Sequence, residues 1–228
     1  MSGLDQKLHA IFERLYDAYG PQCWWPGETP FEVMVGAILT QNTTWSNVER
    51  AIASLKALNY LHAETILALA NEPLARLLRP TGYFNVKARR LRCFCAWYLD
   101  QGGYEPLRGE KTEALRADLL AVQGIGPETA DDILLYAFRR PVFVIDAYTR
   151  RLFARLECIR GNEDYEALRG LFESALGADV PLYNEFHALI VRHAKEVCKS
   201  RPTCDRCCLS LGCPSSAGAT PRPAMDAS

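Results

Sequence analysis

The sequence of 228 residues contains no apolar run as long as 18 residues, so we expect no membrane-spanning helix. It also has no excess of charge, with 26 Lys and Arg against 27 Asp and Glu. This balance neither supports nor excludes nucleic-acid binding, which depends on a local basic face. The first segment, MSGLDQKLHAIFERLYDAYG, lacks the basic start and apolar middle of a signal peptide and predicts an amphipathic helix. We therefore expect a cytoplasmic protein.

Strand patterns are scarce as well. Only residues 141–145 (PVFVI) look strand-like, and this segment is too short and isolated to build a sheet. Helical patterns fill the rest, including the apolar run Phe31–Leu39 and a helically spaced apolar stripe in 47–58. Asn71 and Thr112 are predicted to cap the helices that follow them. About ten helices with short connections predict an all-α architecture.

Four of the nine cysteines form a compact run near the end of the chain, in the order C-x5-C-x2-C-x5-C. They are Cys198, Cys204, Cys207 and Cys213. In a reducing compartment such a cluster indicates metal ligation rather than disulfides. Its compactness suits a [4Fe–4S] cluster, with tetrahedral zinc as the alternative. Zinc sites more often use two C-x2-C pairs, whereas this run has one. Cys208 cannot replace Cys207 without altering both neighbouring spacings, so we expect it to be unligated.

A glycine turn lies between two predicted helices in residues 119–130, LLAVQGIGPETA. Gly124 and Gly126 permit a tight turn that points backbone N–H groups outward, with the apolar Ile125 held between them. The helix that Pro127 opens adds its positive N-terminus, so the turn can bind a phosphate oxygen without reading a base. A purely structural helical hairpin would also use glycine.

Asp146 follows the apolar segment VFVI and begins the helix AYTRRLFARL. Aspartate is a favoured helix N-cap, and on the pattern alone this structural role is expected. The two roles, capping and chemistry, are compatible.

Taken together, GIGPETA, the aspartate segment and the cysteine run resemble the endonuclease III superfamily of helix-hairpin-helix DNA glycosylases. Three further motifs resemble its 3-methyladenine DNA glycosylase branch: WWP at 24–26, LTQNT at 39–43 with an aromatic at 45, and TGYFNVKARRL at 81–91. The resemblance covers nearly all of residues 10–197. In the first cysteine gap this chain is one residue shorter than the C-x6-C-x2-C-x5-C pattern of the family.

The resemblance implies a two-domain, all-α helix-hairpin-helix glycosylase fold with a C-terminal [4Fe–4S] loop. Residues 22–140 would form a helical barrel domain ending in the hairpin, and residues 1–21 plus 141–214 the iron–sulfur cluster domain. Residues 215–228, which are small, polar and proline-containing, would be a disordered tail. The expected partner is double-stranded DNA with damaged bases, bound by a monomer that is cytoplasmic and associated with the nucleoid.

By the same resemblance, Asp146 supplies a catalytic carboxylate that stabilises an oxocarbenium-like sugar and orients or deprotonates the attacking water. Glu128 stands where bifunctional members carry the lysine that forms a Schiff base. A carboxylate cannot form an imine, so the chain is expected to lack an efficient lyase step. An alternative role for Glu128 is simply to favour the helix N-terminus electrostatically.

The remaining site residues are also assigned by resemblance. The predicted base pocket consists of Trp24, Trp25, Pro26 and Trp45, whose rings would sandwich a cationic base. The pattern alone equally allows these rings to be packing residues. The predicted DNA contacts are Gln41, which would fill the gap left by the extruded nucleotide, Lys87 on a phosphate, and Gly124, Ile125 and Gly126 of the hairpin.

These assignments predict a monofunctional DNA glycosylase of base excision repair that hydrolyses the N-glycosidic bond of alkylated purines and leaves an abasic site. One alternative is a glycosylase for mismatched thymine or uracil, or for oxidised pyrimidines, with weak lyase activity at the abasic site. The other is a non-catalytic iron–sulfur protein that binds DNA.

Overall fold

The computed structural model describes residues 3–216, and within them every regular element is helical and no β-strand occurs. The predicted all-α class is thus confirmed. The strand-like segment 141–145 is irregular, although Val142 to Ile145 are almost fully buried. The predicted disordered tail, 215–228, lies outside the described residues except for Ser215 and Ser216, which belong to the short 3₁₀ turn Pro214–Ser216. None of the helices in the described part combines the length and apolar character needed to cross a bilayer.

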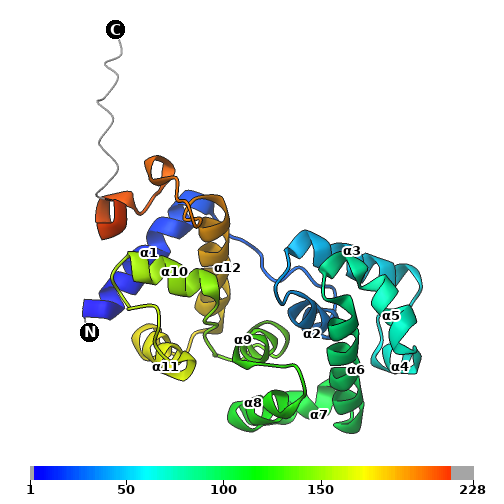
Figure 1. The fold of residues 1–228 in the computed structure, drawn as a ribbon. Helices are drawn as coiled ribbons and strands as arrows, with labels where there is room; N and C mark the ends of the chain where they lie inside the picture. The colour runs from blue at the N-terminus through cyan, green and yellow to red at the C-terminus, as the bar shows by residue number, and fades with distance from the viewer. Residues whose placement is uncertain (1–2, 217–228) are drawn as a thin grey trace. The chain divides into compact units, whose positions relative to one another are not determined.

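The chain forms two compact units. One combines the N-terminal segment up to Trp24 with the residues from Phe143 onward, and the other comprises Trp25–Val142. In Figure 1 the first unit contains the blue helix α1 and the yellow-green to red part of the chain, and the second contains the helices labelled α2 to α9.

The unit Trp25–Val142 is built around one buried helix, α2. Its elements are α2 (Pro30–Leu39), α3 (Trp45–Ala57), α4 (Ala63–Ala68), α5 (Asn71–Leu77), α6 (Phe84–Asp100), α7 (Tyr104–Gly109), α8 (Thr112–Ala121), α9 (Pro127–Asp132) and a π-helical turn (Ile133–Ala137). All residues from Glu32 to Leu39 are buried, and α2 packs against α3, α6, α9 and the π-helical turn. Thr29 caps it by accepting a hydrogen bond from the Glu32 amide at 3.1 Å.

Two predicted caps in this unit are wrong by one position. Asn71 and Thr112 are the first helical residues of α5 and α8, and the N-cap positions are Ala70 and Lys111, whose side chains make no capping bond. The helix that starts at Pro127 also differs from a regular helix. It widens after Asp132 into the π-helical turn, in which the Phe138 amide donates to the Ile133 carbonyl at 3.2 Å.

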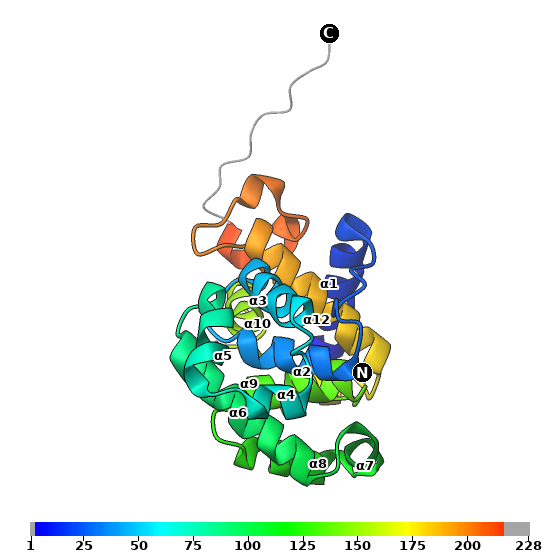
Figure 2. The same ribbon diagram turned by 90° about the vertical axis from the view of Figure 1, so that its right-hand side faces the viewer.

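The other unit joins one helix from the start of the chain to the C-terminal helices. Its elements are α1 (Gly3–Tyr19), α10 (Ala147–Arg155), α11 (Tyr165–Leu176), α12 (Val180–Glu196) and 3₁₀ turns at Cys204–Arg206, Ser210–Gly212 and Pro214–Ser216. Helix α12 packs against α1 and α10, and its contact with α1 is visible in Figure 2. Three phenylalanines form an aromatic core. The ring centroid of Phe172 lies 4.9 Å from that of Phe143 and 4.8 Å from that of Phe153. Burial of each such side chain stabilises the fold by about 1.5–3 kcal/mol.

Candidate active site

Asp146 occupies the N-cap position of α10, as predicted. Its Oδ1 accepts a hydrogen bond from the Thr149 amide at 2.6 Å, and only 8 % of the residue is exposed. The buried apolar segment that precedes it fixes the backbone at this point. The carboxylate is therefore held in a defined position at the positive end of a helix.

The second oxygen of this carboxylate faces an imidazole that the sequence analysis missed. Nε2 of His187, in the middle of α12, lies 3.6 Å from Asp146 Oδ2, and the histidine is 5 % exposed. Burial on its own raises the pKa of Asp146. The neighbouring His187 and the Thr149 amide outweigh that effect, so the pKa of Asp146 lies below its usual value. The site thus holds a buried carboxylate that is ionised at neutral pH.

Lys195 is a second basic group that acts electrostatically on Asp146. Its Nζ lies 5.9 Å from the ring centroid of Trp24 and 5.8 Å from that of Tyr148. Burial lowers the pKa of Lys195, and the charge of Asp146 partly opposes this. His187 and Lys195 are eight positions apart on α12, a spacing that places both on one face of the helix. In the sequence, only this spacing indicated that the two basic residues lie on the same side.

In the unit Trp25–Val142, the glycine turn connects α8 to α9 and its two glycines differ. Gly124 has φ +96°, and a Cβ there would lie 2.3 Å from Cγ of Arg90, so both conformation and packing require glycine. Gly126 has φ −98°, and no heavy atom lies within 4 Å of a Cβ built on it. Ile125 is buried and anchors the turn, whereas Glu128 is exposed in the first turn of α9.

Gln41, in the loop after α2, is bound to this turn. Its Nε2 donates to the Gly124 carbonyl at 3.1 Å and to Thr129 Oγ1 at 2.9 Å. Nη1 of Arg90 donates to Gln41 Oε1. A residue predicted to enter the DNA duplex is thus engaged with the hairpin, and it would have to exchange these bonds to do so.

Lys87 does not fit its predicted contact with phosphate. The side chain is 2 % exposed, and its Nζ donates to the carbonyls of Leu39 at 2.9 Å and Thr81 at 2.7 Å. Burial lowers the pKa of Lys87 to about 8. The amine ties the end of α2 to the 3₁₀ turn Arg79–Thr81, which precedes α6, and it is not presented to a ligand.

The predicted base pocket is divided between the two units. Trp25 and Trp45 belong to one unit and lie with ring centroids 5.2 Å apart, nearly perpendicular to each other. Tyr136 of the π-helical turn, which the sequence analysis missed, lies 5.0 Å from Trp25. Gly36 of α2 allows this packing, since a Cβ there would lie 3.1 Å from Trp25 Nε1. Pro26 is exposed, and Trp24 belongs to the other unit.

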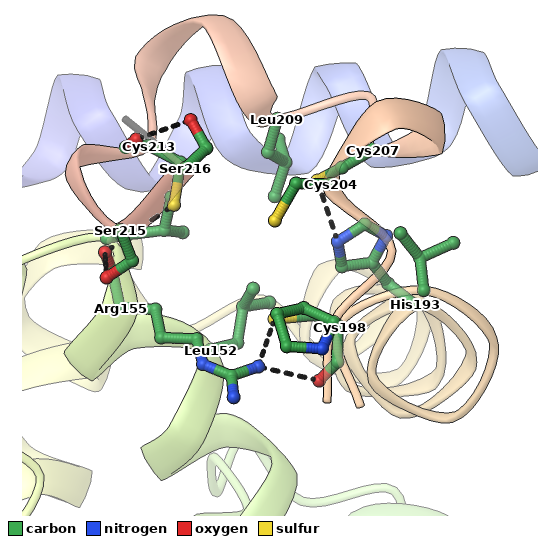
Figure 3. A pocket seen from close by; sticks show the side chains of 13 residues that line it. Leu152, Arg155, His193, Cys198, Cys204, Cys207, Leu209, Cys213, Ser215 and Ser216 are labelled. Carbon is green, nitrogen blue, oxygen red and sulfur yellow. Dashed lines mark hydrogen bonds between the residues drawn. The ribbon is translucent and has the colours of Figure 1, made fainter. Parts of the chain in front are cut away.

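The four cysteines of the C-terminal run line one cavity of about 50 Å³ (Figure 3). Its walls also include Leu152, Val197, Leu209, Arg155 and His193. Nη1 of Arg155 lies 3.2 Å from the Cys198 sulfur, and His193 Nε2 lies 3.5 Å from the Cys207 sulfur. Among the described residues, Cys208 does not line this cavity.

This donor set fits an iron–sulfur cluster in composition. Within residues 3–216, no group of three or more His, Cys, Asp or Glu side chains is placed to hold a single metal ion. A [4Fe–4S] cluster binds each thiolate to a different iron, so the four sulfurs need to surround one space rather than meet at one point. Four thiols around one largely apolar cavity meet that requirement.

A family comparison identifies this all-α fold, with its glycine turn between two helices, as that of a helix-hairpin-helix DNA glycosylase. The family model "HhH-GPD superfamily base excision DNA repair protein" matches residues 35–177, and the chain belongs to this superfamily. A candidate DNA repair glycosylase from Methanocaldococcus jannaschii is 45 % identical over 91 % of this chain and 96 % of its own length.

Two solved structures are similar over most of the chain. The 3-methyladenine DNA glycosylase of H. pylori bound to 1,N6-ethenoadenine has a TM-score of 0.73 and 32 % identity, covering 85 % of this chain and 97 % of that one. A non-covalent complex of endonuclease III with DNA has a TM-score of 0.81 at 21 % identity, covering 94 % and 97 %. The similarity to endonuclease III is evidence for the fold alone, whereas the H. pylori enzyme is similar in sequence as well.

Proposed function

We propose that the protein is a monofunctional DNA glycosylase that removes alkylated purines of the 3-methyladenine type and leaves an abasic site. The observation that carries the proposal is Asp146, a carboxylate that stays ionised although it is buried. Such a group can stabilise a cationic sugar strongly, because little water screens it. The similarity to the H. pylori 3-methyladenine DNA glycosylase supports the substrate class.

The reaction needs little help at the leaving group. In a purine alkylated at N3 or N7 the base is positively charged, so it takes the electron pair of the N-glycosidic bond and leaves as a neutral molecule. The positive charge moves to the sugar, where the carboxylate of Asp146 stabilises it. A water molecule then adds to the sugar carbon and gives its proton to the carboxylate.

Selection of a cationic base is assigned to the aromatic rings. Trp45 and Tyr136 each lie against Trp25. We propose that Trp24, Trp25, Pro26 and Trp45 bind the base. A cation over an indole face gains about 0.5–2 kcal/mol, and stacking of a flipped base gains about 1–3 kcal/mol. A neutral base gains only the free energy of stacking, so the rings favour the positively charged, alkylated purine.

DNA binding is assigned to the hairpin. We propose that the backbone of Gly124, Ile125 and Gly126 contacts a phosphate, and that Gln41 leaves its bonds to the hairpin and fills the gap in the duplex. Glu128, in place of the Schiff-base lysine, would leave hydrolysis as the route of base release, carried out by a monomer on double-stranded DNA.

For the cysteine cavity we propose a [4Fe–4S] cluster held by Cys198, Cys204, Cys207 and Cys213, with zinc as the alternative. When bound, the cluster would cross-link the loop that follows α12. Arg155 already ties this loop to α10, because its guanidinium donates to the carbonyls of Cys198, Lys199 and Ser200. The proposed role is structural.

The test is release of labelled bases from methylated DNA, followed by chromatography of the products. We expect wild type to release alkylated purines and Asp146→Asn to be slower by about 10²-fold or more. Asp179→Asn is the matched control, because Asp179 caps α12 with the same bond geometry, accepting from the Leu182 amide at 2.9 Å. Asparagine is also a good cap, so neither variant should unfold. Full turnover by Asp146→Asn would refute the catalytic assignment.

Borohydride separates hydrolysis from the lyase alternative. We expect no covalent protein–DNA complex to be trapped, because Glu128 stands in place of the lysine that forms the Schiff base in bifunctional members. A trapped complex would defeat the monofunctional assignment. In that case Lys195→Met identifies whether the amine of Lys195, whose pKa is influenced by Asp146, formed it.

A further inference from the structure

We infer that His187 is a positioning residue for base release: it orients the second carboxylate oxygen of Asp146 and compensates its buried negative charge. This inference rests on the proposed role of Asp146 as the catalytic carboxylate. It assigns a function to a histidine that lies on a largely apolar helix and belongs to none of the sequence motifs.

The geometry gives each carboxylate oxygen its own partner. Oδ1 accepts the Thr149 amide at 2.6 Å, which belongs to the same helix as the aspartate. Oδ2 faces His187 Nε2 at 3.6 Å, from α12, which packs against α10. A single capping bond would leave the carboxylate free to rotate about its bond to Cβ. The second partner, on a different helix, restricts that rotation.

The need for charge compensation follows from burial. Asp146 and His187 are 8 % and 5 % exposed, and a buried carboxylate without a cationic or hydrogen-bonding partner takes up a proton instead of staying ionised. Lys195 also acts electrostatically on Asp146, but its ammonium is 5.8 to 5.9 Å from the rings of Tyr148 and Trp24. From α11, Tyr165 contributes a neutral hydroxyl that lies 3.4 Å from the Ile145 amide. His187 is the basic group that faces Oδ2 directly, with its Nε2 at 3.6 Å.

His187 should affect how the rate of base release depends on pH. His187 favours the ionised form of Asp146 and so keeps the pKa of the carboxyl low. If base release requires the carboxylate, activity falls when the pH drops through that pKa. Removal of the imidazole raises the pKa of Asp146, so the acid limb of the rate profile moves to higher pH.

The experiment measures single-turnover base release from methylated DNA between about pH 3 and 8, corrected for release without enzyme, together with affinity for DNA carrying an abasic-site analogue. The variants are His187→Leu, which removes the ring nitrogens, and His187→Gln, which keeps a neutral N–H donor. Tyr183→Phe is the control, because Tyr183 is buried one turn away on α12 and its hydroxyl lies 3.4 Å from the Glu173 carbonyl. Asp146→Asn is measured in parallel.

We expect His187→Leu to move the acid limb upward by about one pH unit, which corresponds to roughly tenfold slower release on the acid side. His187→Gln should recover part of the rate, and Tyr183→Phe should keep the wild-type profile. Affinity for the abasic analogue should not change. If His187→Gln folds and keeps the wild-type acid limb while Asp146→Asn is inactive, the inference about His187 is wrong and the proposed function stands. Activity of Asp146→Asn would instead remove the proposed function itself.

Discussion

Lys87 and Asp146 are both buried ionisable residues, but their polar partners differ. Lys87 donates to two backbone carbonyls, those of Leu39 and Thr81, and its pKa falls to about 8. Asp146 faces His187 and a backbone amide, and its pKa falls below that of a free aspartate. For the lysine the charged form is disfavoured, whereas for the aspartate it is favoured. The two residues therefore differ: Lys87 joins elements of the fold, whereas Asp146 is a buried, ionised carboxylate that we propose is catalytic.

Replacement of Lys87 by Met tests this structural role. The unfolded chain binds more protons than the folded one between the folded pKa of about 8 and the ordinary value of 10.5, so Lys87 makes wild type more stable as the pH rises through that window. At its alkaline end, we expect Lys87→Met to lower the free energy of unfolding by about 1–3 kcal/mol, because two buried carbonyls lose a donor. Urea unfolding at a series of pH values measures the difference.

DNA binding provides the control for the same residue. If Lys87 contacted a phosphate, Lys87→Met would reduce the slope of log affinity against log salt concentration by about one. We expect Lys87→Met to leave this slope unchanged. Arg89→Met, an exposed position on α6, should leave stability unaffected at every pH. A reduced salt slope in Lys87→Met alone would restore the phosphate contact that burial argues against.

At the scale of elements, the hairpin shows how two glycines in one motif can have separate purposes. Gly124 is needed for its positive φ and for the Arg90 side chain that packs on it, and Arg90 in turn holds Gln41. Gly126 has an ordinary φ and open space in front of its α-carbon. The first glycine is required by the fold, and the second leaves room for a ligand to approach the backbone.

Alanine at each glycine separates the two purposes. Gly124→Ala should lower the free energy of unfolding by about 1–3 kcal/mol, through backbone strain and displacement of Arg90. Gly126→Ala should change it by less than about 0.5 kcal/mol, yet weaken binding to duplex DNA because the new methyl group obstructs a phosphate. Chemical unfolding and a fluorescence binding titration measure the pair. Wild-type DNA affinity in Gly126→Ala would show that no phosphate approaches this backbone.

The helical fold and the capping role of Asp146 could be predicted from the sequence, because helical periodicity and N-cap preference are local properties. Burial could not be predicted in the same way. Lys87 was predicted to contact a phosphate, and only the packing of α2 against α6 shows that its side chain is enclosed. His187 and Tyr136 were missed because their partners lie far away in the sequence. The remaining site assignments, and the predicted domain boundaries, stay predictions.

At the scale of the whole molecule, the unit that carries Asp146 draws on both ends of the chain. Helix α1 packs against α11 and α12, and the C-terminal loop returns to α10 through Arg155. The backbone carbonyl of Arg155 also accepts from Cys213 Sγ at 3.5 Å and from Ser215 Oγ at 3.0 Å. One residue of α10 thus contacts both the start and the end of the cysteine loop. A metal centre in this loop would stabilise α10, the helix that Asp146 caps, because both belong to one packed unit.

Adjacent cysteines provide the sharpest test of that centre. Among the described residues, Cys207 lines the cavity and Cys208 does not, although both are half-buried. We expect Cys207→Ser, purified without oxygen, to lose bound iron and sulfide and to unfold at a lower temperature, since metal binding is coupled to folding. Cys208→Ser should keep both. Elemental analysis of the wild-type protein decides between the two metals: iron with inorganic sulfide supports the cluster, and zinc without iron would overturn it. Loss of the centre in Cys208→Ser but not in Cys207→Ser would show that the ligand set has been assigned to the wrong thiol.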